Sequence, residues 1–195
     1  MADRVRFKRW ARWLGTFVGF PLAGVAARAV AGNIDALGAA AIGGLIGGVV
    51  LGAVQAVIGG IEPGGRLRWI GATAAGLAVG LTVGASAVSY HTDTASLVAM
   101  GAICGAAVGA AQALSIPMRR VDRILWAVAT PVLWAGGWLI TSQVIVDTDR
   151  QHAVFGASGA LAVSALAGVL YALRHQPSTQ QAVALTGRSS DQVAA

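Results

Sequence analysis

The chain has 195 residues, of which 56% are hydrophobic and 11% are charged, and its mean hydropathy is +0.69. Because a soluble domain carries about 25% charged residues, this composition excludes an ordinary soluble protein and indicates a membrane-embedded one. The formal net charge of +6 does not predict a nucleic-acid partner, because the basic residues stand at the ends of apolar stretches.

Six apolar stretches follow one another along the chain, and each approaches the roughly 20 residues that cross a hydrocarbon core of about 30 Å. The short connections contain helix breakers and caps, so consecutive helices should form antiparallel hairpins. The sequence therefore predicts an all-α, polytopic membrane protein with six transmembrane helices. The expected spans are residues 13–31, 34–58, 67–90, 94–116, 124–146 and 151–173.

Two polar segments flank this transmembrane domain, which covers residues 13–174. Residues 1–12 are basic, and residues 175–195 are rich in Ser, Thr and Gln, which is typical of a disordered tail. The basic start and the apolar run after it also resemble a signal peptide with a cleavage site near Ala31. We expect the first helix to be retained, because it carries the same spacing of Trp and Gly as later helices.

A spacing of 56 to 59 residues recurs three times. Trp13, Trp69 and Trp126 lie at the start of the first, third and fifth expected spans, and a glycine follows each of them eleven residues later. A fixed period is the signature of a repeat architecture. Since each unit holds two helices, all three should have the same orientation, as parallel repeats about an axis along the membrane normal. We expect a pseudo-threefold bundle built from residues 13–58, 69–115 and 126–174.

The distribution of Lys and Arg predicts the orientation of this bundle. With the N-terminus inside, twelve basic residues fall in cytoplasmic segments, and only Arg28 and Arg150 fall outside. This asymmetry over short loops follows the positive-inside rule. We expect a multi-pass protein of the cell inner (plasma) membrane with both termini in the cytoplasm.

Small residues recur at every fourth position in four of the predicted helices. Helices in lipid gain no hydrophobic energy by touching, so their association depends on close van der Waals packing, which small residues permit. These rows are therefore interpreted as helix-packing positions. They are Gly44, Gly48 and Gly52; Gly76, Gly80 and Gly84; Gly101, Gly105 and Gly109; and Ala160, Ser164 and Gly168.

Gln55 and Gln112 stand at equivalent positions near the predicted cytoplasmic ends of their helices, and Tyr171 is the third equivalent. As a functional site, these residues would form a polar ring that lines a vestibule or binds a lipid headgroup. As structural groups, the two amides would make interhelical hydrogen bonds worth roughly 0.6–1.7 kcal/mol. The structural interpretation is favoured, because amides near an interface are inexpensive to bury and stabilise helix contacts.

Residues 156–159 read Gly-Ala-Ser-Gly, which resembles the nucleophile motif of rhomboid intramembrane proteases. A nucleophilic serine needs a base within hydrogen-bond reach. The rhomboid pattern places a histidine on a later helix, whereas Ser158 lies on the last predicted helix. Small-residue spacing explains Ser158 equally well, so catalysis is not predicted.

Other catalytic and metal-binding patterns are missing from the sequence. Pairs of Asp and His near the predicted outer ends, Asp93 with His91 and Asp149 with His152, are weak candidates for a metal or proton site. They are better explained as helix caps, because Asp before an apolar run suits a helix N-terminus. The single cysteine, Cys104, excludes an intramolecular disulfide. We expect no cofactor and no metal.

The pattern G-x-x-x-G-x-x-Q closes one helix, and an Arg three residues before a Trp opens the next. It reads residues 48–55 followed by Arg66-Leu67-Arg68-Trp69, and again residues 105–112 followed by Arg123-Ile124-Leu125-Trp126. This pattern resembles hairpin repeats of uncharacterised bacterial integral membrane proteins over most of residues 13–174. The resemblance implies the fold and no activity.

Two functions from different classes fit these observations. The first is a non-catalytic scaffold or accessory subunit of a membrane complex, whose partners are the lipid bilayer and other membrane subunits or further copies of the chain. The alternative is a passive pore or small-solute carrier with its pathway along the pseudo-threefold axis. An intramembrane serine protease is a remote third function.

Overall fold

The structure is a computed structural model, and it describes residues 2–144 and 154–174. All the regular elements of this described part are helices, which confirms the all-α class predicted from the sequence. The elements are α1 (Ala2–Leu14), η1 (Gly15–Val18), α2 (Gly19–Ala31), α3 (Leu37–Ile58), α4 (Pro63–Ala87), α5 (Thr94–Ser115), α6 (Arg120–Val144) and α7 (Ala157–Arg174).

Five of the six expected spans are long and apolar enough to cross a bilayer, counting α1, η1 and α2 as one helix over Asp3–Ala31. The sixth helix, α7, begins at Ala157 rather than at residue 151. Its 18 residues span about 27 Å at 1.5 Å per residue, slightly less than a typical hydrocarbon core. The predicted tail over residues 175–195, together with Asp149 and His152, lies outside the described residues.

The first span is longer than predicted, because the basic residues before Trp13 continue the helix as α1. A short 3₁₀ turn, η1, interrupts it in the middle. Pro21 lies just after this turn and lacks the N–H that would bond to the carbonyl of Phe17, so the regular helix ladder is broken there. The hydroxyl of Thr16 donates to the carbonyl oxygen of Trp13 at 2.7 Å.

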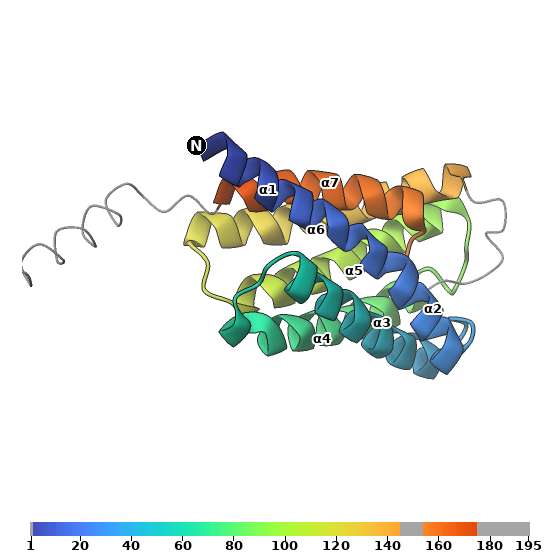
Figure 1. The fold of residues 1–195 in the computed structure, drawn as a ribbon. Coiled ribbons are helices and arrows are strands. Elements are labelled where there is room, and N and C mark those ends of the chain that lie inside the picture. The colour runs from blue at the N-terminus through green and yellow to red at the C-terminus, as the bar shows by residue number, and fades with distance from the viewer. Residues whose placement is uncertain (1, 145–153, 175–195) are drawn as a thin grey trace, which may run out of the picture.

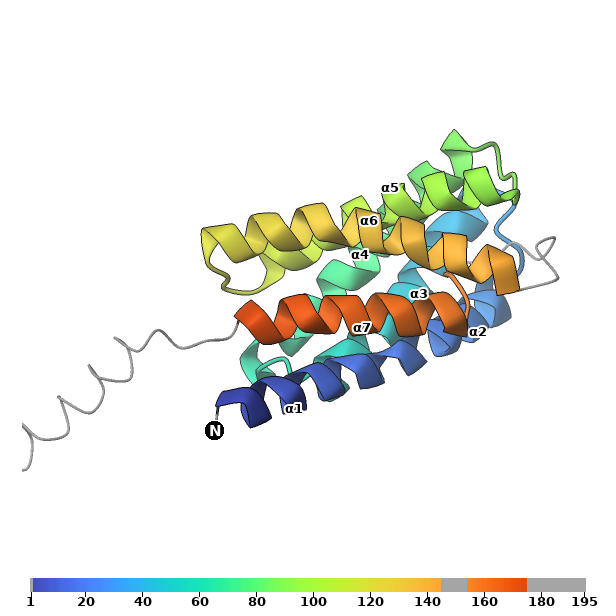
Figure 2. The same ribbon diagram turned by 90° about the horizontal axis from the view of Figure 1, so that it is seen from above.

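The helices form a closed ring in which every neighbour along the chain is also a neighbour in space. Each helix packs beside the next one in sequence, and α7 returns to pack against α1 (Figures 1 and 2). The N-terminus of α1 and the C-terminal end of α7 lie at the same end of the bundle (Figure 1). Short connections produce this arrangement, since a chain that turns within a few residues must place consecutive helices antiparallel.

Glycines bring the helix backbones of this ring close together. A Cβ added at Gly44 would lie 2.6 Å from the carbonyl oxygen of Leu77 in α4, and one at Gly80 would lie 2.7 Å from Cα of Cys104 in α5. Ser164 of α7 is 2% exposed. An added Cβ would also lie within 3.1 Å of an atom of the neighbouring helix at Gly48, Gly52, Gly76, Gly84, Gly101, Gly105, Gly109 and Gly168.

Large apolar side chains fill the interior of the ring. Phe20 of α2 stacks on Phe155, which precedes α7, with ring centroids 4.6 Å apart, and Trp134 of α6 meets Phe155 edge-on at 5.4 Å. Leu77 and Leu81 of α4 are completely buried in the same core. The centre of the bundle is therefore occupied by side chains from helices that are not adjacent in the ring.

Candidate functional site

The two predicted glutamines meet at the end of the bundle that holds the N-terminus. Gln55 lies in the last turn of α3 and Gln112 in the last turn of α5, and they are 7% and 1% exposed. The amide nitrogen of Gln112 donates to Oε1 of Gln55 at 3.0 Å and to Oγ1 of Thr73 at 2.9 Å. The hydroxyl of Thr73 in turn donates to the carbonyl oxygen of Trp69. The two amides thus join three helices.

Each glutamine also accepts a hydrogen bond from the indole that lies 14 residues further along the chain. Nε1 of Trp69 donates to Oε1 of Gln55, and Nε1 of Trp126 donates to Oε1 of Gln112, both at 3.1 Å. A Gln in the last turn of one helix and a Trp in the first turns of the next face each other across a hairpin. The fixed spacing of 14 was visible in the sequence, but the hydrogen-bonded pairing was not predicted.

Three tryptophans pack against one another beside these amides. The ring centroids are 6.0 Å apart for Trp13 and Trp69, 5.5 Å for Trp13 and Trp126, and 6.0 Å for Trp69 and Trp126. Tyr171 of α7 stacks on Trp13 with centroids 4.3 Å apart. We call these residues the tryptophan–glutamine cluster: Trp13, Gln55, Trp69, Gln112, Trp126 and Tyr171.

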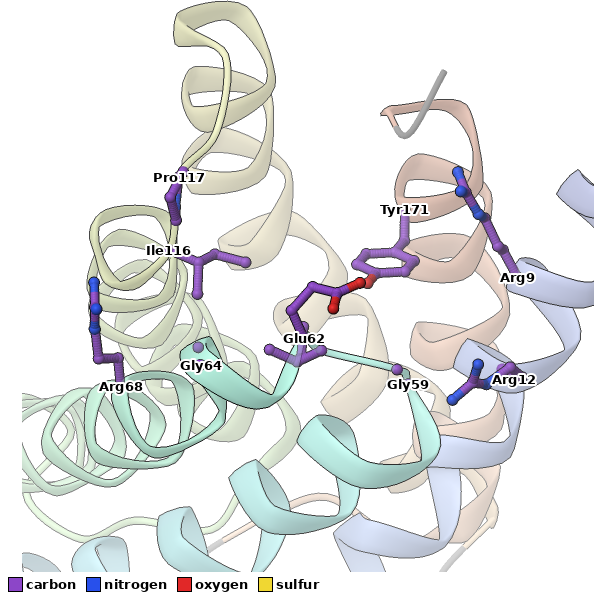
Figure 3. A pocket seen from close by; sticks show the side chains of 12 residues that line it. Arg9, Arg12, Gly59, Glu62, Gly64, Arg68, Ile116, Pro117 and Tyr171 are labelled. Carbon is purple, nitrogen blue, oxygen red and sulfur yellow. The ribbon is translucent and has the colours of Figure 1, made fainter. Parts of the chain in front are cut away.

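A pocket with a volume of about 640 Å³ opens at the same end of the bundle (Figure 3). Arginines from α1 and α4 line it, together with glycines from the α3–α4 connection and the first turn of α4, and Glu62 is the one acidic residue of the lining. Tyr171 belongs both to this pocket and to the tryptophan–glutamine cluster. We call it the basic pocket; it is lined by Arg9, Arg12, Gly59, Gly60, Ile61, Glu62, Gly64, Gly65, Arg68, Ile116, Pro117 and Tyr171.

Local backbone geometry holds one of these arginines in place. Nε of Arg12 donates to the carbonyl oxygen of Ile58 at 3.2 Å, at the end of α3. Gly60 has a φ of +82°, a left-handed conformation that favours glycine, and a Cβ there would lie 2.9 Å from Cζ of Arg12. The guanidinium of Arg12 therefore packs directly against the backbone of Gly60, where a side chain would displace it. In the sequence these arginines indicate only topology, and the pocket that they line could not be predicted because it depends on α1 meeting the α3–α4 connection.

The other sequence candidates stay apart from this end. Asp93 caps α5: its carboxylate accepts hydrogen bonds from the hydroxyl and the backbone N–H of Ser96. Both bonds lower the pKa of Asp93, and the bond from the Ser96 hydroxyl has the larger effect. The interpretation as a cap is confirmed. In the described residues, no group of three His, Cys, Asp or Glu side chains is placed to hold a metal ion.

Ser158 lies in the first turn of α7, at the opposite end of the bundle from the basic pocket. Within the described part of the chain, it makes no hydrogen bond with a histidine, and His91 is exposed in the connection between α4 and α5. Two further histidines, His152 and His175, lie outside the described residues.

A ring of apolar helices with a polar cluster and a basic pocket at one end has the architecture of a multi-pass membrane protein. Comparison with protein-family models, with curated proteins and with solved structures finds no match to this chain.

Proposed function

We propose that this chain is a non-catalytic integral membrane protein that serves as a scaffold or accessory subunit of a membrane complex. The observation that carries the proposal is a row of small residues along most of the outward face of α5. Ala95, Ala99, Ala106 and Ala110 are all exposed along this face, and Leu114 is exposed at its end. In a bilayer, a face of small residues lets the backbone of a further helix approach closely and gain van der Waals contact.

The interior supports a structural role over a pore. The amides that would line a pathway, Gln55 and Gln112, bond to each other and to indoles rather than to open space. Beyond them the core is filled by side chains such as Phe20, Leu77 and Trp134. A solute following the axis would have to displace these groups, which favours the scaffold over the passive carrier.

Purification of the full chain in mild detergent, followed by mass analysis, tests the scaffold. We expect self-association or a co-purifying membrane protein, and Ala106→Leu should reduce it because the larger side chain separates the helices. Val128→Leu is the matched control, since Val128 is exposed on α6 outside the alanine face. The proposal would be contradicted by a strictly monomeric protein with no co-purifying partner, or by an equal loss of association in both variants.

We also propose that the six helices are three parallel copies of a two-helix unit around a pseudo-threefold axis. Each unit's second helix supports this by contacting the Trp that opens another unit: Gln55 with Trp69, and Gln112 with Trp126. Tyr171 completes the series by stacking on Trp13. In an experimental structure, the three hairpins should superpose after rotations near a third of a turn; an inverted hairpin would exclude the proposal.

Parallel units and the positive-inside rule together predict a bundle of six spans with both termini in the cytoplasm. Reporter fusions after Arg66, after Arg120 and in the C-terminal tail should read as cytoplasmic. Fusions near Asn33 and His91 should read as external, because each lies between two antiparallel helices at the opposite end of the bundle. One reversed pair of fusions would overturn this orientation.

A further inference from the structure

We infer that the basic pocket binds the phosphate-bearing headgroup of an anionic membrane phospholipid. Three arginines and one carboxylate line the pocket. Its volume of about 640 Å³ lies within the range of roughly 300–1,000 Å³ typical of small-molecule sites. Guanidinium groups bind phosphate oxygens through paired, charge-assisted hydrogen bonds, so a phosphate ester is the ligand chemistry that this lining favours.

The position of the pocket favours a lipid as the source of that phosphate. The pocket lies where α3 ends and α4 begins, at the ends of two apolar helices long enough to cross a bilayer. Headgroups lie at this depth, and basic pockets between transmembrane helices are known headgroup sites. The charged lining is joined by Ile61, Ile116 and Pro117, which offer an apolar wall to the glycerol and upper acyl carbons of a lipid.

The pocket is kept open by glycines and by a fixed arginine. Gly59 and Gly60 of the α3–α4 connection and Gly64 and Gly65 in the first turn of α4 all line it, so these four positions contribute backbone and no side chain to the pocket wall. Arg12 is held by its bond to Ile58 and lies against Gly60. A guanidinium fixed in this way loses less rotamer freedom when it binds a ligand than a mobile side chain would. The α4 helix also begins at the pocket, and its N-terminal dipole favours an anion.

Glu62 places one negative charge in the basic pocket, and its effect on anion binding should be opposite to that of the arginines. Figure 3 shows its carboxylate extending into the pocket and pointing toward the hydroxyl end of Tyr171. A phosphate in the pocket would be repelled by this carboxylate, which is exposed and so is free to swing outward. Removing the negative charge should therefore strengthen the binding of an anionic headgroup, whereas removing a positive charge should weaken it.

The experiment measures binding of short-chain phosphatidylglycerol and phosphatidylcholine to the purified full chain in detergent, by native mass spectrometry or thermophoresis. We expect a preference for phosphatidylglycerol, and a loss of about tenfold in its affinity in Arg12→Gln and in Arg68→Gln, as for a lost charge-assisted hydrogen bond. Glu62→Gln should bind phosphatidylglycerol more tightly. Arg120→Gln is the matched control, since Arg120 begins α6 and does not line the pocket.

Each outcome decides the proposal. The melting temperature of every variant without lipid shows whether the fold is intact. If Arg12→Gln unfolds the protein, Arg68→Gln tests the site instead, because Arg68 is exposed. The proposed lipid site would be wrong if Arg68→Gln and Arg120→Gln lowered the affinity for phosphatidylglycerol equally. It would also be wrong if the unaltered protein bound both lipids with equal affinity. Inorganic phosphate and glycerol phosphate form a further arm: if they bind as tightly as phosphatidylglycerol, the ligand is a soluble phosphate and the lipid assignment is wrong.

Discussion

Replacing Gly48 by alanine should destabilise the bundle by about 1–3 kcal/mol, the usual cost of overpacking a close contact. A Cβ at this position would lie 2.8 Å from the carbonyl oxygen of Thr73 and closer still to Cα of Ala74, both in the α4 backbone. Backbone atoms cannot rotate away as a flexible side chain can, so α3 and α4 must separate. The higher helix propensity of alanine, at most about 1 kcal/mol, opposes this effect without cancelling it. Thermal or SDS unfolding of the purified protein measures the change.

Gly71→Ala is the control for this substitution. Gly71 lies on α4 and has nothing within 4 Å of the added Cβ. Its replacement by alanine should leave the stability unchanged or raise it slightly, because only the helix propensity changes. If Gly48→Ala were as stable as Gly71→Ala, the close approach of α3 and α4 would not exist in the protein.

The second large effect is expected at Gln112, in the tryptophan–glutamine cluster. Gln112→Leu has a similar volume but removes the acceptor of the buried Trp126 N–H and one donor to Gln55. Losing the acceptor of a buried N–H costs about 1–3 kcal/mol, and bulk solvent cannot replace the amide because Gln112 and Trp126 are only 1% and 4% exposed. The variant should therefore unfold at a clearly lower temperature or SDS fraction than the unaltered chain.

A double-mutant cycle separates the hydrogen bond from packing. Trp126→Phe alone leaves Oε1 of Gln112 without its indole donor, whereas the combination with Gln112→Leu removes both partners. The combined loss should fall short of the sum of the single losses by about 1 kcal/mol. Gln143→Leu should change stability by less than about 0.5 kcal/mol, because this amide is exposed on α6. Additive losses at Gln112 and Trp126 would show that the bond contributes nothing.

Apart from the starts of the first and last helices, the helix bounds could be predicted from the sequence within four residues. The predicted start of α5 at Thr94 agrees with the structure, because Asp93 caps the helix through Ser96. The first helix begins eleven residues earlier than expected, since charged residues end an apolar stretch without ending a helix. The Trp69–Gln55 and Trp126–Gln112 pairs escaped prediction, although their spacing recurs, because residue spacing says nothing of which atoms face each other across a hairpin.

The sequence by itself determined the helical class, the number of apolar stretches and the antiparallel order of the helices. Those properties depend on hydropathy and loop length, which are local. Only the tertiary structure decided that α7 closes the ring against α1, that Gln55 and Gln112 bond to each other, and that Arg12 and Arg68 line one pocket. The physical reason is that these contacts join residues from different hairpins. Their geometry depends on how far the glycine rows let helix backbones approach, and that distance is set by all the helices together.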